Sequence, residues 1–432
     1  MVPESVIIIG GSVAGLLQGL QLKRQGSHVT VLEQDPSKDR HSHESGISIG
    51  PSVVALLDRY DATGRPAAIP TEYMSAAWRH RLRVANTHWA HNMSNWGCLY
   101  LILRANFDGL ASAAVPMPPS PRAGDGPVDY RAGKKVTGVR YNRAKGLVYV
   151  DFVDVQTGDV GEAGAALVLA ADGVHSTVRQ LLQVPTRKEY AGYIGWRGTV
   201  PEKLLSAQTV DYFLNRLNFT LLRGTYFISY LIPTEGGHTE PGKRLLNWVW
   251  YFPVQENSAE MAEIFTDIHG KMHGNTVPQG LVNPAVWQAQ LARYVPQMTA
   301  PLAEVVSLTP RVFVTKVGEA QCTTPSFFDG RLVLVGDAFT GFRSHLGKAS
   351  EQAAQHALQM DRVWRGEISQ EERDREANYY ARRLVLLNRV IGFMGLGWWW
   401  AVLKTLVEYV GVVGANQIGL MSNPRVNSPR VM

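Results

Sequence analysis

A short apolar run near the start of the chain, followed by a glycine-rich turn, constrains the fold most. Residues 6–9 are uncharged and β-branched, which predicts a buried parallel strand. A leucine-containing helical pattern follows the turn and ends at Gly26, and a second apolar run covers residues 28–32. The order strand, turn, helix, strand predicts a βαβ unit of a doubly wound α/β fold. The turn consists of Gly10, Gly11, Ser12, Val13, Ala14 and Gly15.

The composition of this turn is typical of a dinucleotide-binding loop. Small residues let the backbone approach a pyrophosphate, and the helix N-terminus offers free N–H groups and a positive dipole end. Glu33 lies about 20 residues further on, where a carboxylate accepts a ribose hydroxyl. Ser12 departs from the G-x-G-x-x-G pattern, because it stands where the second glycine is expected. An ordinary strand-to-helix turn is the weaker interpretation, since strand, helix, second strand and acid all occur in order.

Composition and charge exclude several classes of protein. The 432 residues suggest two or three domains, and 45% hydrophobic with 19% charged residues excludes extensive disorder. The net charge of +6 is spread along the chain without a nucleic-acid motif, so no nucleic-acid partner is predicted. Cys98 and Cys322 are the only cysteines, which gives no disulfide framework and no metal-ligand spacing. We predict no metal and a reducing, cytoplasmic setting.

An uncharged segment near the C-terminus, residues 390–403, contains three consecutive tryptophans. Arg389 and Lys404 bracket it short of the ~20 residues that a membrane span needs. We predict a helix that packs against the protein or a second subunit, in a monomer or a homodimer. A membrane-surface contact is the second, less favoured interpretation.

Two later stretches repeat the pattern of a buried strand that ends in an aspartate-containing turn. Residues 168–171 lead to Asp172 and Gly173, and residues 332–335 lead to Gly336 and Asp337. Aspartate is favoured in turns, so each residue taken singly is explained equally well as a cap. Because the pattern occurs twice in a chain that starts with a dinucleotide motif, we predict that both aspartates lie at the nucleotide.

The remaining segments complete an α/β architecture. Alternating residues around Val136 and in 147–153 predict a small antiparallel sheet, whereas the Trp-, His- and Arg-rich region between Tyr60 and Trp96 is predicted to be loop-like. Aromatic alternation predicts a β-rich substrate domain, and the chain from residue 371 is predicted to be helical. The predicted parts are the first part of the nucleotide-binding domain at 1–185, the β-rich domain at 186–300, the second nucleotide-binding part at 301–365 and a C-terminal helical segment at 366–432.

With three motifs in this order, the chain resembles the group A flavoprotein monooxygenases, the aromatic hydroxylases of the para-hydroxybenzoate hydroxylase fold. Within the group it is most similar to dihydroxypyridine hydroxylase and its fungal relatives, through residues 190–198 and 336–339. The resemblance implies an FAD cofactor, NADPH or NADH as co-substrate, and O2. It also implies hydroxylation of a phenolic or electron-rich heteroaromatic substrate through a flavin C4a-hydroperoxide.

The resemblance also implies roles for individual residues. Arg104 takes the place of an arginine on the ribityl-phosphate side of the flavin. Arg197 and Tyr230 would form a substrate clamp, in which a guanidinium lowers the pKa of a phenol and a tyrosine donates a hydrogen bond to the same oxygen. A solvent-facing Arg197 and a core Tyr230 are the competing interpretations. The implied cofactor-binding residues are Gly10, Gly11, Ser12, Ala14, Gly15, Glu33, Gln34, Gly46, Arg104, Val136, Asp172, Gly336, Asp337 and Gly347.

The loop after Asp337 departs from the family pattern. Thr340 replaces a histidine, and residues 342–345 replace a proline-containing segment. Glu351 would lie near the flavin pyrimidine, so we expect that it either turns to solvent or alters the redox behaviour. These departures leave two alternatives open: flavin-dependent epoxidation or oxidative rearrangement, and a flavin-binding protein without turnover.

Overall fold

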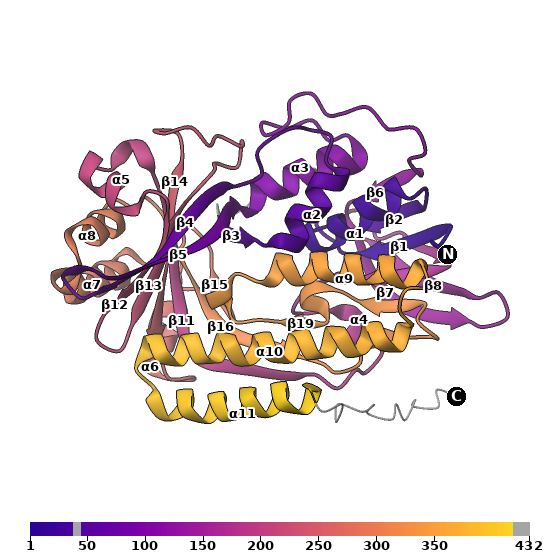
Figure 1. The fold of residues 1–432 in the computed structure, drawn as a ribbon. Helices are drawn as coiled ribbons and strands as arrows, with labels where there is room; N and C mark the ends of the chain where they lie inside the picture. The colour runs from indigo at the N-terminus through magenta and orange to yellow at the C-terminus, as the bar shows by residue number, and fades with distance from the viewer. Residues whose placement is uncertain (38–44, 418–432) are drawn as a thin grey trace.

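The computed structural model describes residues 1–37 and 45–417, and in this part of the chain two large sheets lie at opposite ends of the molecule (Figure 1). The first is a six-stranded sheet that is parallel except at β17. This arrangement confirms the predicted α/β class. Its strands, in spatial order, are β17 (Ser326–Phe327), β18 (Leu332–Leu334), β10 (Leu167–Ala170), β1 (Ser5–Ile9), β2 (His28–Leu32) and β6 (Val128–Arg131).

The predicted βαβ unit is confirmed as β1, α1 (Val13–Arg24) and β2. Gly10 has φ +100°, a conformation that side chains with a Cβ rarely adopt. A Cβ at Gly15 would collide with the Gly10 carbonyl oxygen. The turn therefore requires small residues for steric reasons, and α1 lies directly against the end of β1.

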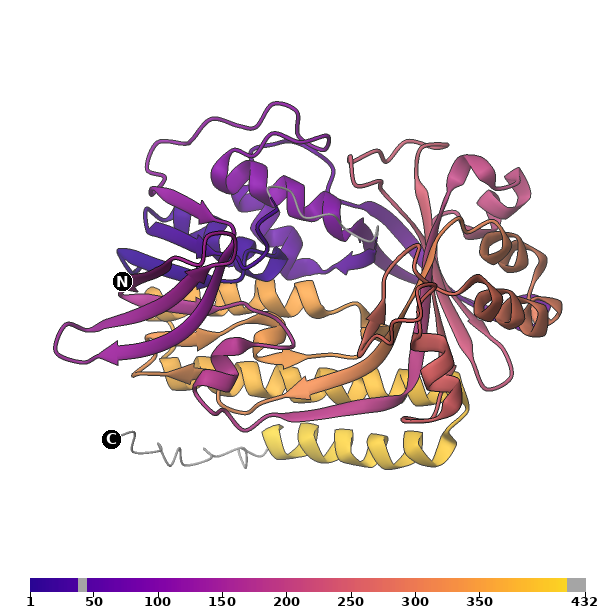
Figure 2. The same cartoon turned by 180° about the vertical axis from the view of Figure 1, so that it is seen from behind.

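Each face of the parallel sheet is covered by different elements (Figures 1 and 2). One face packs against α1, α2 (Pro51–Tyr60), α3 (Trp96–Asp108) and α9 (Ala349–Trp364). The other packs against α4 (Thr177–Leu181), part of α10 (Gln370–Leu396) and a three-stranded sheet. The small antiparallel sheet is thus confirmed with one additional strand; it consists of β7 (Lys134–Asn142), β8 (Leu147–Asp154) and β9 (Val160–Ala165).

The second large sheet has ten strands. Side chains alternate between its faces because a strand has a period of two. Its outer face packs against α5 (Ala207–Phe213), α6 (Ala259–Phe265), α7 (Pro284–Tyr294) and α8 (Ala300–Ser307), and its inner face lies toward the parallel sheet (Figure 1). The strands are β15 (Thr276–Val277), β16 (Val312–Gln321), β11 (Arg187–Pro201), β14 (Leu245–Pro253), β13 (Tyr226–Ile232), β12 (Arg216–Leu221), β4 (Ile69–Trp78), β5 (Arg81–Asn95), β3 (Gly46–Ile49) and, paired with β16, β19 (Thr340–Gly341).

Strands from three of the four predicted segments meet in this sheet, and the domain boundaries themselves stay a prediction. The loop predicted between Tyr60 and Trp96 is wrong, because that region contains the long β4–β5 hairpin. The two residues of its turn are Arg79 and His80, with Arg79 at φ +51°. Such turns usually carry glycine or asparagine, so the sequence lacked the usual hairpin signal.

The C-terminal segment forms a helical hairpin in place of one helix through residues 390–403. α10 is capped by Ser369 at its N-terminus and by Gly397, which has φ +76°, at its C-terminus. α11 (Trp399–Gln417) then returns alongside α10 (Figure 1). The expectation of a continuous helix was wrong because Gly397 adopts the left-handed conformation that ends many helices. Within the described residues, the helices lack the combined length and apolar character that a membrane crossing requires.

A buried ion cluster joins the two halves of the molecule. Glu319 of β16 accepts a hydrogen bond of 2.8 Å from Arg343 Nε, and both side chains are 1% exposed. Arg389 of α10 donates to the same carboxylate. One carboxylate therefore holds together the ten-stranded sheet, the loop after Asp337 and the longest helix.

Replacing Glu319 with Ala should lower the free energy of unfolding by about 3 kcal/mol, because it leaves the buried Arg343 with only the more distant, partly exposed Glu189 carboxylate at 3.6 Å. The control is Glu162→Ala, which removes the partner of Arg140 from a pair whose side chains are about half exposed and should cost no more than about 1 kcal/mol. Urea denaturation of both variants measures the difference. Equal effects would contradict the assignment of Glu319 as the joint.

Candidate active site

Four of the predicted motifs lie along one edge of the parallel sheet. Ile9 of β1 pairs with Leu32 of β2 and with Ala170 of β10, and Ala170 pairs in turn with Leu334 of β18. Because the strands are parallel and in register, the residues that follow them leave the sheet at the same edge. The motifs at this edge are Gly10 after β1, Glu33 after β2, Asp172 after β10, and Gly336 with Asp337 after β18.

The first turn is held by Glu33. The Gly11 N–H donates to Glu33 Oε2 at 2.8 Å, and the Tyr130 hydroxyl donates to the Gly11 carbonyl oxygen at 3.2 Å. The Arg104 guanidinium carbon lies 3.6 Å from the centroid of the Tyr130 ring. Arg104 is buried and also donates to Asp108 and to the Tyr100 hydroxyl. The Tyr130 ring thus lies between Arg104 and the dinucleotide turn. This is a suitable position for an arginine near a phosphate group.

Asp172 and Asp337 carry buried oxygens without hydrogen-bond partners. Asp172 Oδ2 accepts the Val178 N–H at 3.1 Å, whereas Oδ1 of each aspartate lacks a partner among the described residues. Burial raises the pKa of Asp337 to about 6, although the Arg179 guanidinium partly opposes this shift. Arg179 Nη1 is also buried without a partner in the described part of the chain. Buried polar groups of this kind call for a ligand or water to satisfy them.

The Gly336 motif packs on the start of α1. A Cβ at Gly336 would lie 3.0 Å from the Ala14 Cβ, and the Gly336 N–H donates to Nδ1 of the buried His356 of α9 at 3.1 Å. Gly347 has φ +59° and ends η4 (Ser344–Leu346), directly before α9. Residues 336–347 therefore run from α1 to the N-terminus of α9.

Glu351 corrects the expectation that its side chain turns to solvent, and an effect on the redox behaviour stays a prediction. It is buried, and its carboxylate accepts the Ser52 N–H at 3.0 Å and the Val53 N–H at 3.4 Å. It thus caps the N-terminus of α2, where a negative charge is favourable. The carboxylate neither turns to solvent nor remains unpaired, because a second helix supplies its hydrogen-bond donors.

The other predicted cofactor residues lie in different surroundings. Ser12 precedes α1 without using its side chain as a cap, and Gln34 is exposed. Val136 is buried in β7, within the core beneath the parallel sheet. Gly46 begins β3 of the ten-stranded sheet, and its N–H donates to Asn247 Oδ1 of β14 at 3.0 Å. Their roles toward a cofactor stay predictions.

Arg197 and Tyr230 lie on the inner face of the ten-stranded sheet. Trp196 belongs to the outer core, so the next side chain along β11 points inward. Arg197 Nη2 donates to Ser344 Oγ at 2.9 Å, while Arg197 Nε is buried without a partner among the described residues. Burial raises the pKa of Tyr230, and Arg197 partly opposes that shift. The structure therefore brings the two predicted clamp residues to one face, where the Arg197 charge partly offsets the effect of burial on the pKa of Tyr230.

The sequence did not reveal the cluster around His345. Its Nε2 lies 2.6 Å from the Tyr193 hydroxyl and its Nδ1 lies 2.6 Å from the Tyr226 hydroxyl. Burial, with further contributions from Arg343 and Arg197, holds the pKa of His345 well below its usual value. Next to it, the Tyr251 hydroxyl lies 2.7 Å from Ser344 Oγ. The departure of residues 342–345 from the family pattern was the available signal.

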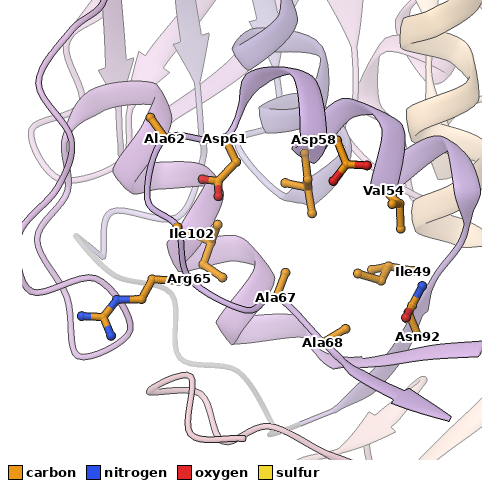
Figure 3. Close-up of a pocket in the computed structure, with 12 residues that line it drawn as sticks. Ile49, Val54, Asp58, Asp61, Ala62, Arg65, Ala67, Ala68, Asn92 and Ile102 are labelled. Carbon is orange, nitrogen blue, oxygen red and sulfur yellow. The ribbon is translucent and has the colours of Figure 1, made fainter.

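A pocket of about 570 Å³ lies elsewhere, between α2, α3 and the segment after α2 (Figure 3). Its apolar lining includes Ile49, Val54 and Ile102, and the Arg65 side chain points away from them. None of the predicted site residues lines it. Within the described residues, no group of three or more His, Cys, Asp or Glu side chains could hold a metal ion.

Comparison with known proteins agrees with this geometry. The model of a family described as FAD binding domain-like matches residues 190–319. The chain is 25% identical to 2,6-dihydroxypyridine 3-monooxygenase of Paenarthrobacter nicotinovorans, over 84% of this chain and 83% of that protein. It is also 25% identical to 6-hydroxynicotinate 3-monooxygenase of Bordetella bronchiseptica, over 83% and 82%. The solved 2,6-dihydroxypyridine-3-hydroxylase from Arthrobacter nicotinovorans superimposes with a TM-score of 0.73 at 23% identity, covering 91% of this chain and 92% of that one.

The chain is therefore similar in sequence to named aromatic monooxygenases, and it shares the fold of a solved one. The residues of this chain fit the FAD of these monooxygenases. A Cβ at Gly10, Gly11 or Gly15 would collide with the protein itself, so the backbone of the first turn is bare of side chains at these positions. Unpartnered oxygens of Asp172 and Asp337 lie at the same edge and match the hydroxyl-rich chain of a dinucleotide.

Replacing Gly15 with Val should abolish FAD retention, because the new Cβ collides with the Gly10 carbonyl and displaces α1 from the turn. The purified variant should lack the flavin absorbance of the wild type. Gly274→Val is the control, since Gly274 is exposed and a Cβ there meets no atom within 4 Å. A Gly15→Val protein with full flavin absorbance would remove the basis of the assignment.

Replacing Asp337 with Asn should stabilise the cofactor-free protein at pH 7 by about 1–3 kcal/mol. The folded-state pKa of about 6 exceeds the unfolded value, so the stabilising contribution of the protonated group is full below about pH 4 and is lost as the pH rises through 6. The gap between variant and wild type should therefore be present at pH 7 and absent near pH 4.

Urea denaturation of the cofactor-free proteins at both pH values measures this gap. Asp329→Asn, at a carboxylate whose side chain is 63% exposed, is the control and should show little difference at either pH. An Asp337→Asn variant with the same stability gap at pH 4 and pH 7 would contradict the buried ionisation.

Proposed function

We propose that this protein is a cytoplasmic, FAD-dependent and NAD(P)H-using monooxygenase that hydroxylates a phenolic or electron-rich heteroaromatic ring. The relatives named above act, by their names, on hydroxylated pyridine rings. One structural observation carries the proposal. The loop that begins at Asp337, on the nucleotide edge, reaches the inner face of the ten-stranded sheet and binds Arg197 through Ser344.

The dinucleotide edge supplies the cofactor-binding groups. The backbone from Gly10 to Gly15 and the positive end of α1 suit a pyrophosphate, Glu33 suits a ribose hydroxyl, and Asp337 suits the ribityl chain. When bound and reduced by NAD(P)H, FAD supplies the activated oxygen that is transferred to the substrate. The protein must orient the ring, hold its proton and exclude water.

Arg197 would set the charge of the substrate. A guanidinium beside a phenolic oxygen favours the phenolate, which lowers the pKa of that phenol and makes the ring a better nucleophile. Ser344 occupies one side of the guanidinium, at 2.9 Å from Nη2, and leaves Nε without a partner among the described residues. Ser344 is thus a positioning residue, and the Tyr230 hydroxyl would donate a second hydrogen bond to the same oxygen.

The aromatic inner face would exclude water from the reaction. Tyr193, Tyr226 and Tyr251 are all buried there, around a His345 whose low pKa keeps the imidazole neutral. A dry site strengthens the attraction between Arg197 and a bound phenolate, because fewer water dipoles screen the two charges. The exclusion of water and the charge of Arg197 therefore both strengthen the attraction of the clamp for a bound phenolate.

The test of the function is a screen of hydroxylated pyridines and phenols for stimulation of NAD(P)H oxidation by the purified yellow protein. The mass of the product formed under labelled O2 must show one oxygen atom added to the ring. An epoxide or a rearranged skeleton would assign the alternative oxidation. A protein that holds FAD but consumes no NAD(P)H with any of these substrates would be a flavin-binding protein without turnover.

Replacing Arg197 with Gln should leave FAD bound and remove most hydroxylation at neutral pH, by about 10²-fold or more. Activity should return as the pH rises toward the pKa of the free phenol, because hydroxide then supplies the phenolate that Arg197 no longer favours. Turnover against pH, with product quantified, is the measurement.

The matched control is Arg187→Gln, on the same strand, where the side chain is 70% exposed. It should leave both turnover and its pH profile unchanged. If Arg197→Gln behaves like this control, the clamp is wrong, whatever the outcome for FAD binding.

A further inference from the structure

The three nitrogen atoms of the Arg197 guanidinium lie in different surroundings. Nη2 donates to Ser344 Oγ at 2.9 Å. Nε is buried without a partner among the described residues, and it lies 3.6 Å from the position that a Cβ on Gly195 would take. Because Gly195 has no side chain, the arginine can lie back along β11 over it. Nη1 is the nitrogen that is neither buried nor hydrogen-bonded in the described part of the chain, so it remains accessible to a substrate.

This arrangement limits the anions that the guanidinium can bind. A carboxylate binds arginine best through two parallel hydrogen bonds. The guanidinium has two pairs of donors for this purpose, Nη1 with Nη2 at its end and Nε with Nη2 along its side. The side pair of Arg197 is closed because Nε is buried. At the end pair, a carboxylate oxygen would compete with Ser344 for Nη2, whereas a single oxygen atom can approach Nη1 without competition.

Ser344 is held in its position by a second strand. The Tyr251 hydroxyl lies 2.7 Å from Ser344 Oγ, and the Tyr251 side chain is buried in β14. Tyr251 pairs directly with Gly195, so the strands that carry Arg197 and Tyr251 are neighbours. A ligand that displaces Ser344 must therefore break the hydrogen bonds to both side chains. Residue 344 is itself exposed, so a ligand can reach the pair that it forms with Arg197.

The side chains on either side of Ser344 in the sequence offer no second positive charge. Arg343 is 1% exposed and already bound to Glu319. His345 is neutral, because burial holds its pKa well below the usual value. A carboxylate beside Arg197 would therefore lose its water without gaining a two-point partner from these residues, which is unfavourable. A phenolate carries its charge on one oxygen, for which a single nitrogen is a sufficient donor.

We propose that Ser344 makes Arg197 a one-point donor and thereby restricts the clamp to hydroxylated rings that carry no carboxylate. This proposal rests on the monooxygenase function proposed above and names the substrate class of the same site. Ser344 acts through the guanidinium, so it is a positioning residue that determines the choice of substrate.

Equilibrium binding to the oxidised, FAD-loaded protein tests this preference without turnover. Calorimetric titration with two pairs of ligands gives the Kd of each: 4-hydroxybenzamide with 4-hydroxybenzoate, and 6-hydroxynicotinamide with 6-hydroxynicotinate. The members of a pair match in shape and differ in charge. The wild type should bind each amide at least about tenfold more tightly than the matching carboxylate. A carboxylate that binds as tightly as its amide, or a protein that binds none of the four compounds, would overturn the proposal.

The second pair gives the sharper comparison. One relative is named as a 6-hydroxynicotinate monooxygenase. Weak binding of 6-hydroxynicotinate here would separate the two proteins by substrate class, although they are 25% identical.

Ser344→Ala tests the role of the hydroxyl. The substitution releases Nη2 and opens the end pair, so each carboxylate should bind at least about tenfold more tightly than to the wild type. The amides should bind with Kd values within about threefold of the wild type. Ser344→Thr is the matched control, because it keeps the hydroxyl and its methyl group has room at an exposed position. Ser344→Thr should retain the wild-type preference.

Flavin absorbance verifies that both variants hold FAD. An unchanged ratio of amide to carboxylate affinity in Ser344→Ala would overturn the proposal, as would a loss of preference in Ser344→Thr that equals the loss in Ser344→Ala. These outcomes are separate from the test of the function. A protein that hydroxylates rings but binds both members of a pair equally would keep the function and lose the preference, and one that prefers the amides without oxidising NAD(P)H would show the reverse.

Discussion

The parallel register of β2, β1, β10 and β18 is the constraint on which the site depends. Four strands that begin far apart in the sequence end at the same level, so the residues that follow them are delivered to one edge. The backbone hydrogen bonds of the strands fix this alignment without any contribution from the polar side chains. The aspartates can therefore keep unpartnered oxygens at the edge while the apolar core below them provides the stability.

A single loop then connects this edge with the second sheet. Between Gly336 and Gly347 the chain leaves the parallel sheet, pairs briefly as β19 with β16, and contributes three consecutive polar residues to the ten-stranded sheet. Arg343 binds Glu319, Ser344 binds Arg197 and His345 lies between two tyrosines. A change in the conformation of the turn at Gly336 would therefore be transmitted to the inner face along residues 336–347.

The local features were predictable from the sequence, and the long-range ones were not. The βαβ unit and the strands before Asp172 and Asp337 each depend on residues within one element, where apolar runs and small turn residues are informative. The β4–β5 hairpin was missed because its turn residues, Arg79 and His80, are not the glycine or asparagine that usually indicate a hairpin turn.

The partners of Glu351 and His345 lie more than a hundred residues away in the chain. No periodicity in one sequence encodes such pairs, so the expectation that Glu351 turns to solvent was wrong. The placement of Arg197 on the inner face followed from strand alternation. Its contact with Ser344 required the fold.

The neutral imidazole of His345 has one N–H hydrogen and two tyrosine neighbours. One tyrosine must therefore donate to the ring while the other accepts from it, so the two hydroxyls are chemically different although their distances are equal. Reversing the direction of one hydrogen bond requires a change of tautomer, which reverses the other as well. The hydrogen-bonded chain of Tyr193, His345 and Tyr226 thus has two alternative orientations, and its dipole points in opposite directions in the two.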